Sequence, residues 1–231
     1  GIGMIQVMNH EDAQTLPGHQ FEVDFLLPPL TRFEVLSRVS TALRHSETLS
    51  SLESSTQTDE VTQLYNRTYF LKRLAGEIAL SKRHESPVCC VVLGINYYQV
   101  FLDSYGYEFI NGLLKHLAVI IKSHIRQEDM VARVGDEELA LLLPRSSEKG
   151  AQVMTERIIR SVLELPFEFE EQTEEITLHA GIAGYPMIEE SDTQEADADA
   201  LIRYARHALH NAKSSESRTI QCFGEIKPAF G

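Results

Sequence analysis

Three consecutive acidic side chains near the middle of the chain could bind a metal ion. They belong to the tetrapeptide Gly-Asp-Glu-Glu at residues 135–138, and apolar runs stand on both sides of it at residues 130–134 and 139–143. Two apolar runs joined by a short connection that contains glycine predict a β-hairpin. Carboxylates at the tip of a hairpin could hold Mg²⁺ and, through it, a triphosphate. The alternative is a charged surface turn without a ligand.

Helices and strands must alternate around this hairpin. Apolar residues recur at helical spacing in residues 67–82, 108–124, 151–163 and 200–213, and apolar runs typical of strands cover residues 88–93, 176–183 and 219–223. Helices that cross between strands around one hairpin predict an α/β fold, an α+β sandwich with a mixed sheet. Cys89 and Cys90 lie next to each other in one predicted strand, so their side chains point to opposite faces and cannot pair.

Composition and charge exclude several classes of protein. The 231 residues carry 21 Lys and Arg against 34 Asp and Glu, and the formal charge of −13 repels phosphate backbones and anionic lipids. We therefore expect no nucleic-acid partner and no membrane partner. Because no apolar run approaches the roughly 20 residues of a spanning helix, we expect a cytoplasmic protein. The chain begins with Gly1 rather than Met, which suggests that the natural polypeptide is longer.

Five motifs in one order resemble those of the GGDEF family, the diguanylate cyclase domains of bacterial signalling. The motifs are Asp59–Arg67, which is similar to D-x-L-T-G-L-x-N-R, Asp103–Tyr107 to D-x-Y-G-H, Arg133–Leu139 to R-Y-G-G-D-E-F, Thr177–Ala183 to T-V-S-I-G-I-A, and Ala208–Lys213 to A-L-Y-x-A-K. The resemblance implies a nucleotidyl-cyclase-like fold with a central mixed sheet flanked by helices. It also implies a reaction in which paired domains and two Mg²⁺ ions join two GTP molecules into cyclic di-GMP.

The substrate site implied by this resemblance is degenerate. It comprises Gly94, Leu102, Asn111, Gly135, Asp136 and Lys213. Gly94 stands in place of a metal-binding Asp, and Leu102 and Asn111 stand in place of the residues that bind guanine. Glu137 and Glu138 remain as remnants of the catalytic acids, and Lys213 could contact a phosphate. We therefore expect no catalytic residue, no metal site and no required cofactor, with Mg²⁺ needed only if the chain is an active cyclase.

A second family feature is retained in front of the hairpin. Arg126 and Asp129 match the R-x-x-D inhibitory site, at which family members bind cyclic di-GMP as a product. An arginine can pair with guanine O6 and N7 or with a phosphate, and a carboxylate can accept from guanine N1 and N2. Arg157 lies where the family often supplies a further arginine from a partner domain, although Arg160 is nearby. The alternative for Arg126 and Asp129 is a surface ion pair.

The N-terminal part resembles a different signalling domain. Residues 23–39 are similar to the last strand and helix of a response-regulator receiver, with Pro28 in place of the Lys that senses the phosphoryl group. We predict a truncated or degenerate receiver-like segment over residues 1–45, a helical linker over 46–58 and a degenerate GGDEF domain over 59–226.

Three functions remain open from the sequence. The first is an inactive GGDEF domain that acts as a cyclic di-GMP receptor, as a homodimer with an unidentified downstream protein partner. The second is an active diguanylate cyclase with an atypical signature and product inhibition. The third is a nucleotide-independent scaffold for protein interactions.

Overall fold

A computed structural model of the chain describes residues 4–7, 23–26, 57–170, 172–186, 194–215 and 218–226. The chain divides into two compact units, Gly1–Thr56 and Gln57–Gly231. In the first unit, strand β1 (Met4–Val7) pairs in parallel with β2 (Val23–Leu26). The strand predicted from residue 23 is therefore confirmed. The helix predicted within residues 23–39 and most of the predicted linker lie outside the described residues, so the receiver-like segment stays a prediction.

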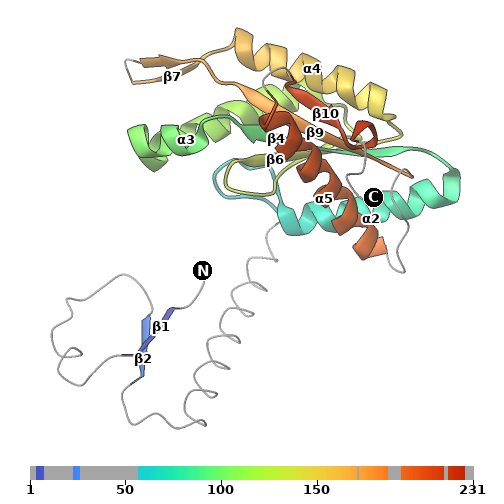
Figure 1. The fold of residues 1–231 in the computed structure, drawn as a ribbon, viewed down its shortest axis with the longest axis horizontal. Coiled ribbons are helices and arrows are strands. Elements are labelled where there is room, and N and C mark those ends of the chain that lie inside the picture. The colour runs from blue at the N-terminus through green and yellow to red at the C-terminus, as the bar shows by residue number, and fades with distance from the viewer. Residues whose placement is uncertain are drawn as a thin grey trace. The chain divides into compact units, whose positions relative to one another are not determined.

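The second unit is built on a mixed sheet of six strands in the order β10-β9-β4-β6-β5-β3 (Figure 1). These strands are β3 (Tyr65–Asn66), β4 (Val88–Ile95), β5 (Met130–Arg133), β6 (Glu138–Pro144), β9 (Leu178–Tyr185) and β10 (Ile220–Cys222). Strand β4 is antiparallel to both of its neighbours, whereas the edge strands β3 and β10 run parallel to β5 and β9. The predicted mixed sheet and the β5–β6 hairpin are confirmed.

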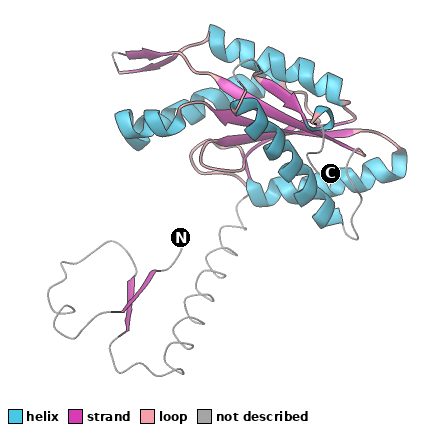
Figure 2. Ribbon diagram, in the orientation of Figure 1, coloured by secondary structure: helices cyan, strands magenta, loops and turns pink. Residues whose placement is uncertain are grey.

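Four helices flank this sheet (Figure 2). They are α2 (Arg67–His84), α3 (Tyr98–His124), α4 (Glu148–Glu164) and α5 (Gln194–Lys213). Buried side chains of α3 and α4 form one core on one face of the sheet, and buried side chains of α2 and α5 form a second core on the other face. A separate hairpin of β7 (Phe167–Phe169) and β8 (Gln172–Glu174) lies outside the main sheet.

The central strand β4 explains why both cores exist. All eight of its residues are buried, because helices cover both faces. Cys89 packs with the α3 and α4 side and Cys90 with the α2 and α5 side, which confirms that the two neighbours point in opposite directions. Among the described residues, no helix is both long and apolar enough to cross a membrane.

Helix α3 consists of two helices that meet at a kink. The φ of 77° and ψ of −176° at Gly106 are not helical and separate residues 98–105 from residues 107–124. The second helix confirms the helix predicted over residues 108–124, whereas the first helix is not predicted. The first half of α3, with Leu102 and Tyr105, packs against the core from the edge.

Candidate functional site

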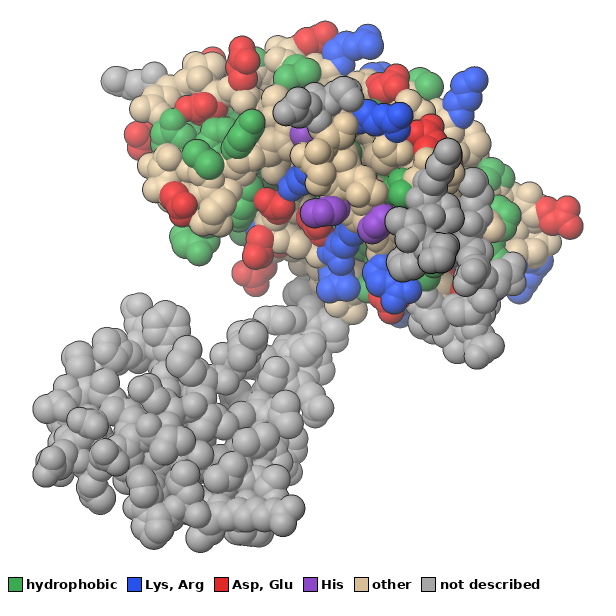
Figure 3. Space-filling model, in the orientation of Figure 1, with side chains coloured by type: hydrophobic (Ala, Val, Ile, Leu, Met, Phe, Trp, Pro, Cys, Tyr) green, Lys and Arg blue, Asp and Glu red, His purple; other side chains and the backbone are tan. Residues whose placement is uncertain are grey.

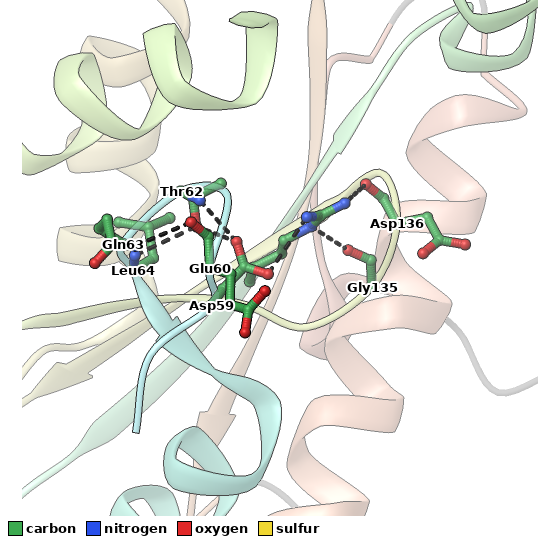
Figure 4. Close-up of polar contacts among 8 residues, drawn as sticks. Asp59, Glu60, Thr62, Gln63, Leu64, Gly135 and Asp136 are labelled. Carbon is green, nitrogen blue, oxygen red and sulfur yellow. Dashed lines mark hydrogen bonds and ion pairs between the residues drawn. The ribbon is translucent and has the colours of Figure 1, made fainter. Parts of the chain in front are cut away.

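One arginine holds the tip of the β5–β6 hairpin in place. Arg133 Nε donates to the Gly135 carbonyl at 3.2 Å, and its Nη2 donates to the Asp136 carbonyl at 3.2 Å (Figure 4). The Nη1 atom of Arg133 lies 3.4 Å from Asp59 Oδ2. The guanidinium therefore joins the hairpin tip to the segment that precedes α2.

The same carboxylate organises the turn in front of α2. Asp59 Oδ1 accepts from the backbone N–H of Thr62 at 2.8 Å and from the Thr62 hydroxyl at 2.7 Å. Asn66 then caps α2, since its side-chain oxygen accepts from the N–H of Tyr69 at 2.9 Å. The motif at residues 59–67 thus forms a hydrogen-bonded turn and the N-cap of α2, and it presents one carboxylate oxygen of Asp59 to Arg133.

Two cations from α5 contact the acidic hairpin. Lys213 Nζ lies 2.7 Å from Glu137 Oε1, and the Arg206 guanidinium lies 2.7 Å from Glu138 Oε2. Arg206 also donates to the Val134 carbonyl at 3.1 Å. Arg206 and Lys213 are seven residues apart, which places them on the same face of α5. Both predicted remnants of the catalytic acids are therefore paired within the chain.

Gly94 lies beside these ion pairs near the end of β4. It is in register with Glu138 on β6 and with His179 on β9. A Cβ at this position would lie 2.8 Å from Lys213 Cε and 3.0 Å from Lys213 Nζ. The lysine therefore occupies the room that a side chain at position 94 would need, and its Nζ lies 3.4 Å from the Ile95 carbonyl.

The other predicted members of the degenerate substrate site lie on α3 and on the hairpin tip. Leu102 is half-buried and packs against the core, and Asn111 is half-buried further along α3. Asp136 is exposed. Burial and the negative charge of Asp136 raise the pKa of Tyr98, the first residue of α3.

A short polar network continues along the ends of β4 and β9. Asn96 Nδ2 donates to the Thr177 hydroxyl at 2.9 Å, so the Asn96 oxygen is left to accept from His179 Nδ1 at 2.5 Å. Burial and the positive charge of Lys213 lower the pKa of His179. Burial and the charge of Lys213 thus both disfavour the protonated form of His179.

The R-x-x-D residues form a closed turn between α3 and β5. Asp129 Oδ2 accepts from the backbone N–H of Arg126 at 2.9 Å, and the Asp129 N–H donates to the Arg126 carbonyl at 3.2 Å. Asp129 Oδ1 is buried and has no hydrogen-bond partner among the described residues. Burial raises the pKa of Asp129, while the bond from Arg126 opposes this shift. The carboxylate of Asp129 therefore accepts a hydrogen bond from the backbone N–H of Arg126. The alternative prediction of a surface ion pair concerned a contact between the two side chains.

Arg157 lies beside this turn. It is exposed on α4, and its Nη2 donates to the carbonyl of His124 at 2.7 Å, two residues before Arg126. His124 itself is fixed by the Ser161 hydroxyl on α4, 2.9 Å from its Nε2. The structure therefore places Arg157 of the same chain close to the turn that holds Arg126 and Asp129, and their role in ligand binding stays a prediction.

Several contacts of the site are not evident from the motifs. The motifs do not predict the pairing of Arg206 with Glu138 or of Lys213 with Glu137. The spacing of seven residues between the two cations was a signal that they share one helix face, but it does not show which acids they meet. The described residues include no group of three or more His, Cys, Asp and Glu side chains that could hold a metal ion.

The mixed sheet with helices on both faces and an acidic hairpin defines an α/β domain of the diguanylate cyclase type. The family model described as "Diguanylate cyclase, GGDEF domain" matches residues 56–219, and the chain belongs to this family. Diguanylate cyclase DgcP of Pseudomonas aeruginosa is 32% identical over 167 residues, which cover 71% of this chain and 24% of that protein. The chain thus spans about a quarter of the length of this relative.

Solved structures show the same fold. The GGDEF domain of TpbB from Pseudomonas aeruginosa is 28% identical, with a TM-score of 0.64 over 71% of this chain and 93% of that chain. The GGDEF domain of DgcB from Caulobacter crescentus, solved in complex with c-di-GMP, is 22% identical, with a TM-score of 0.65 over 73% of this chain and 96% of that chain.

Proposed function

We propose that this chain is a catalytically inactive GGDEF protein that binds cyclic di-GMP through Arg126, Asp129 and Arg157 and transmits the bound state to a protein partner. The observation that carries this proposal is the turn at residues 126–129. It combines an exposed guanidinium with a buried carboxylate oxygen that lacks a hydrogen-bond partner among the described residues.

The unpaired oxygen favours a ligand with N–H donors. A buried acceptor without a partner is unfavourable by about 1–3 kcal/mol. Guanine N1–H and N2–H groups would satisfy Asp129 Oδ1, and Arg126 would meet O6 and N7 or a phosphate. Because Oδ1 is covered, the donor reaches it only when the covering side chains move. The ligand's negative phosphates need local arginines, since the whole chain carries a charge of −13.

Catalytic inactivity is proposed from the degenerate substrate site. Gly94 supplies no carboxylate, and Glu137 already pairs with Lys213. Leu102 cannot hydrogen-bond guanine. The loss of one preorganised transition-state contact lowers a rate by roughly 10² to 10³. The combined losses, which need not multiply, would leave little turnover.

Calorimetric titration with cyclic di-GMP tests the receptor role. We expect the parent to bind in the micromolar range or tighter and Arg126→Ala to abolish binding while the fold is kept, because only the backbone of Arg126 holds the turn. Asp129→Asn is a sharper test. The amide oxygen can still accept from the Arg126 N–H, but its NH₂ group would oppose the guanine donors, so we expect binding to weaken at least about tenfold.

Two controls decide between the alternatives. Arg160→Ala removes another exposed arginine of α4 and should leave the affinity unchanged, whereas Arg157→Ala should lower it. Unchanged affinity in Arg126→Ala would place the site elsewhere.

Sustained product formation from GTP with Mg²⁺ or Mn²⁺, lost in Glu137→Ala, would establish an active cyclase. Flat titrations with GTP, GDP and cyclic di-GMP would leave an interaction scaffold.

A further inference from the structure

We propose that the ammonium group of Lys213 takes the place of a divalent cation at the acidic hairpin, so that this site binds neither Mg²⁺ nor Mn²⁺. The proposal concerns the metal selectivity of the hairpin site. It does not rest on the receptor role, because the turn at residues 126–129 lies outside these contacts.

The contacts of Lys213 are those that a small cation would make. Its Nζ donates to Glu137 Oε1 at 2.7 Å and to the carbonyl of Ile95 at 3.4 Å. A carboxylate and a backbone carbonyl are oxygen ligands typical of a hard cation. The ammonium has three N–H donors, and these two oxygens engage two of them. One protein side chain therefore satisfies the oxygens that would face a bound metal ion.

The absence of a side chain at position 94 allows the lysine to enter. A Cβ at Gly94 would lie 2.8 Å from Lys213 Cε, and Leu209 Cδ2 would be 3.1 Å away from the same Cβ. An aspartate at this position would therefore push the lysine aside as well as add a carboxylate. Glycine at position 94 therefore has two effects: it provides no carboxylate for a metal ion, and it leaves room for the Lys213 side chain.

The charges around the hairpin also oppose a dication. Arg206, which shares a face of α5 with Lys213, pairs with Glu138. The positive charge of Lys213 also contributes to the lowered pKa of His179. The Glu137 and Lys213 side chains are 38% and 29% exposed, so solvent weakens their ion pair. Exclusion of a metal ion thus depends on two effects together, which are the missing second carboxylate and the ammonium already in place.

Manganese binding to four proteins tests this assignment. Free Mn²⁺ is measured by electron paramagnetic resonance with the parent, Gly94→Asp, Gly94→Asp/Lys213→Met and the last variant with Glu137→Gln added. We expect no binding by the parent and weak binding by Gly94→Asp, whose new carboxylate can pair with Lys213. The double variant should bind at least about tenfold more tightly than Gly94→Asp, and Glu137→Gln should reverse this gain.

Two results would overturn the assignment. One is Mn²⁺ binding by the parent that is weakened by Glu137→Gln. The other is a folded double variant that binds no more tightly than Gly94→Asp, because Lys213 would then not be what excludes the ion. A measurement on the parent needs no variant to fold: stoichiometric Mn²⁺ should leave the amide resonances of Ile95 and Glu137 unbroadened, and selective broadening of these signals would contradict the proposal.

Discussion

Individual charges of the β5–β6 hairpin are matched by partners from distant parts of the chain. Asp59 meets Arg133, Glu137 meets Lys213 and Glu138 meets Arg206. All of these side chains are partly exposed, so each pair contributes up to about 1 kcal/mol to stability. Their main effect is geometric, because together they fix the hairpin tip against the start of α2 and the end of α5.

His179 should make the free energy of unfolding depend on pH. Burial and Lys213 lower its pKa in the folded protein below the ordinary value of 6.5, so the unfolded chain binds more protons as the pH falls below that value. The contribution of His179 to the free energy of unfolding is therefore complete above pH 6.5 and is lost as the pH falls through the lowered pKa.

Thermal melting between pH 7.5 and 5 checks this expectation. His179→Asn keeps a donor near Asn96 but does not titrate, so its melting temperature should fall less with acidification than that of the parent. His210→Asn changes an exposed histidine of α5 and should follow the parent. Parallel pH profiles for the parent and His179→Asn would show that His179 has no part in the acid response.

One glycine allows α5 to pack closely on β9. A Cβ at Gly181 would lie 2.0 Å from the Ala205 carbonyl oxygen and 2.2 Å from the backbone nitrogen of Leu209. Both atoms belong to the helix backbone and cannot rotate away. Any side chain on this residue must move α5 from the sheet, and with it the helix that carries Arg206 and Lys213.

Gly181→Ala should therefore lower the free energy of unfolding by about 3 kcal/mol, the upper end of typical overpacking effects. Gly76→Ala in α2 is the matched control, since nothing lies within 4 Å of its added Cβ and alanine should stabilise the helix by about 0.5–1 kcal/mol. Urea unfolding of both variants measures the difference. A midpoint for Gly181→Ala equal to that of the parent would show that α5 adjusts without loss.

Local patterns predict the elements of this fold better than the contacts between them. The apolar run of β4 and the two apolar runs around residues 135–138 follow from side-chain period and turn chemistry, and they are confirmed. The short helix that precedes the kink at Gly106 is not evident from the apolar spacing, whereas the helix after the kink is predicted and confirmed. The pairing of Lys213 with Glu137 joins residues 76 positions apart, so only the packing of α5 beside β4 could show it.

The charge pattern of the whole molecule favours specific over general binding of anions. Figure 3 shows one face, on which the coloured acidic and basic side chains of the described residues are interspersed. With a net charge of −13, the chain as a whole repels an anionic ligand. The proposed binding of cyclic di-GMP would require arginines concentrated at one place, and Arg157 lies close to Arg126 at the turn of residues 126–129.

Ligand binding should therefore change the assembly state. The proposed receptor would bind cyclic di-GMP as a stacked pair that bridges two copies of the domain. Such a pair carries four phosphate charges, which is more than Arg126 and Arg157 of one copy neutralise, so a second copy that supplies its own arginines would stabilise the complex. We expect light scattering after size exclusion to show a higher molar mass with cyclic di-GMP than without it, and Arg157→Ala to reduce the change more than Arg160→Ala does. An unchanged mass under conditions where calorimetry shows saturation would mean that one copy holds the ligand alone, and transmission to a partner would then have to begin from a change within the monomer.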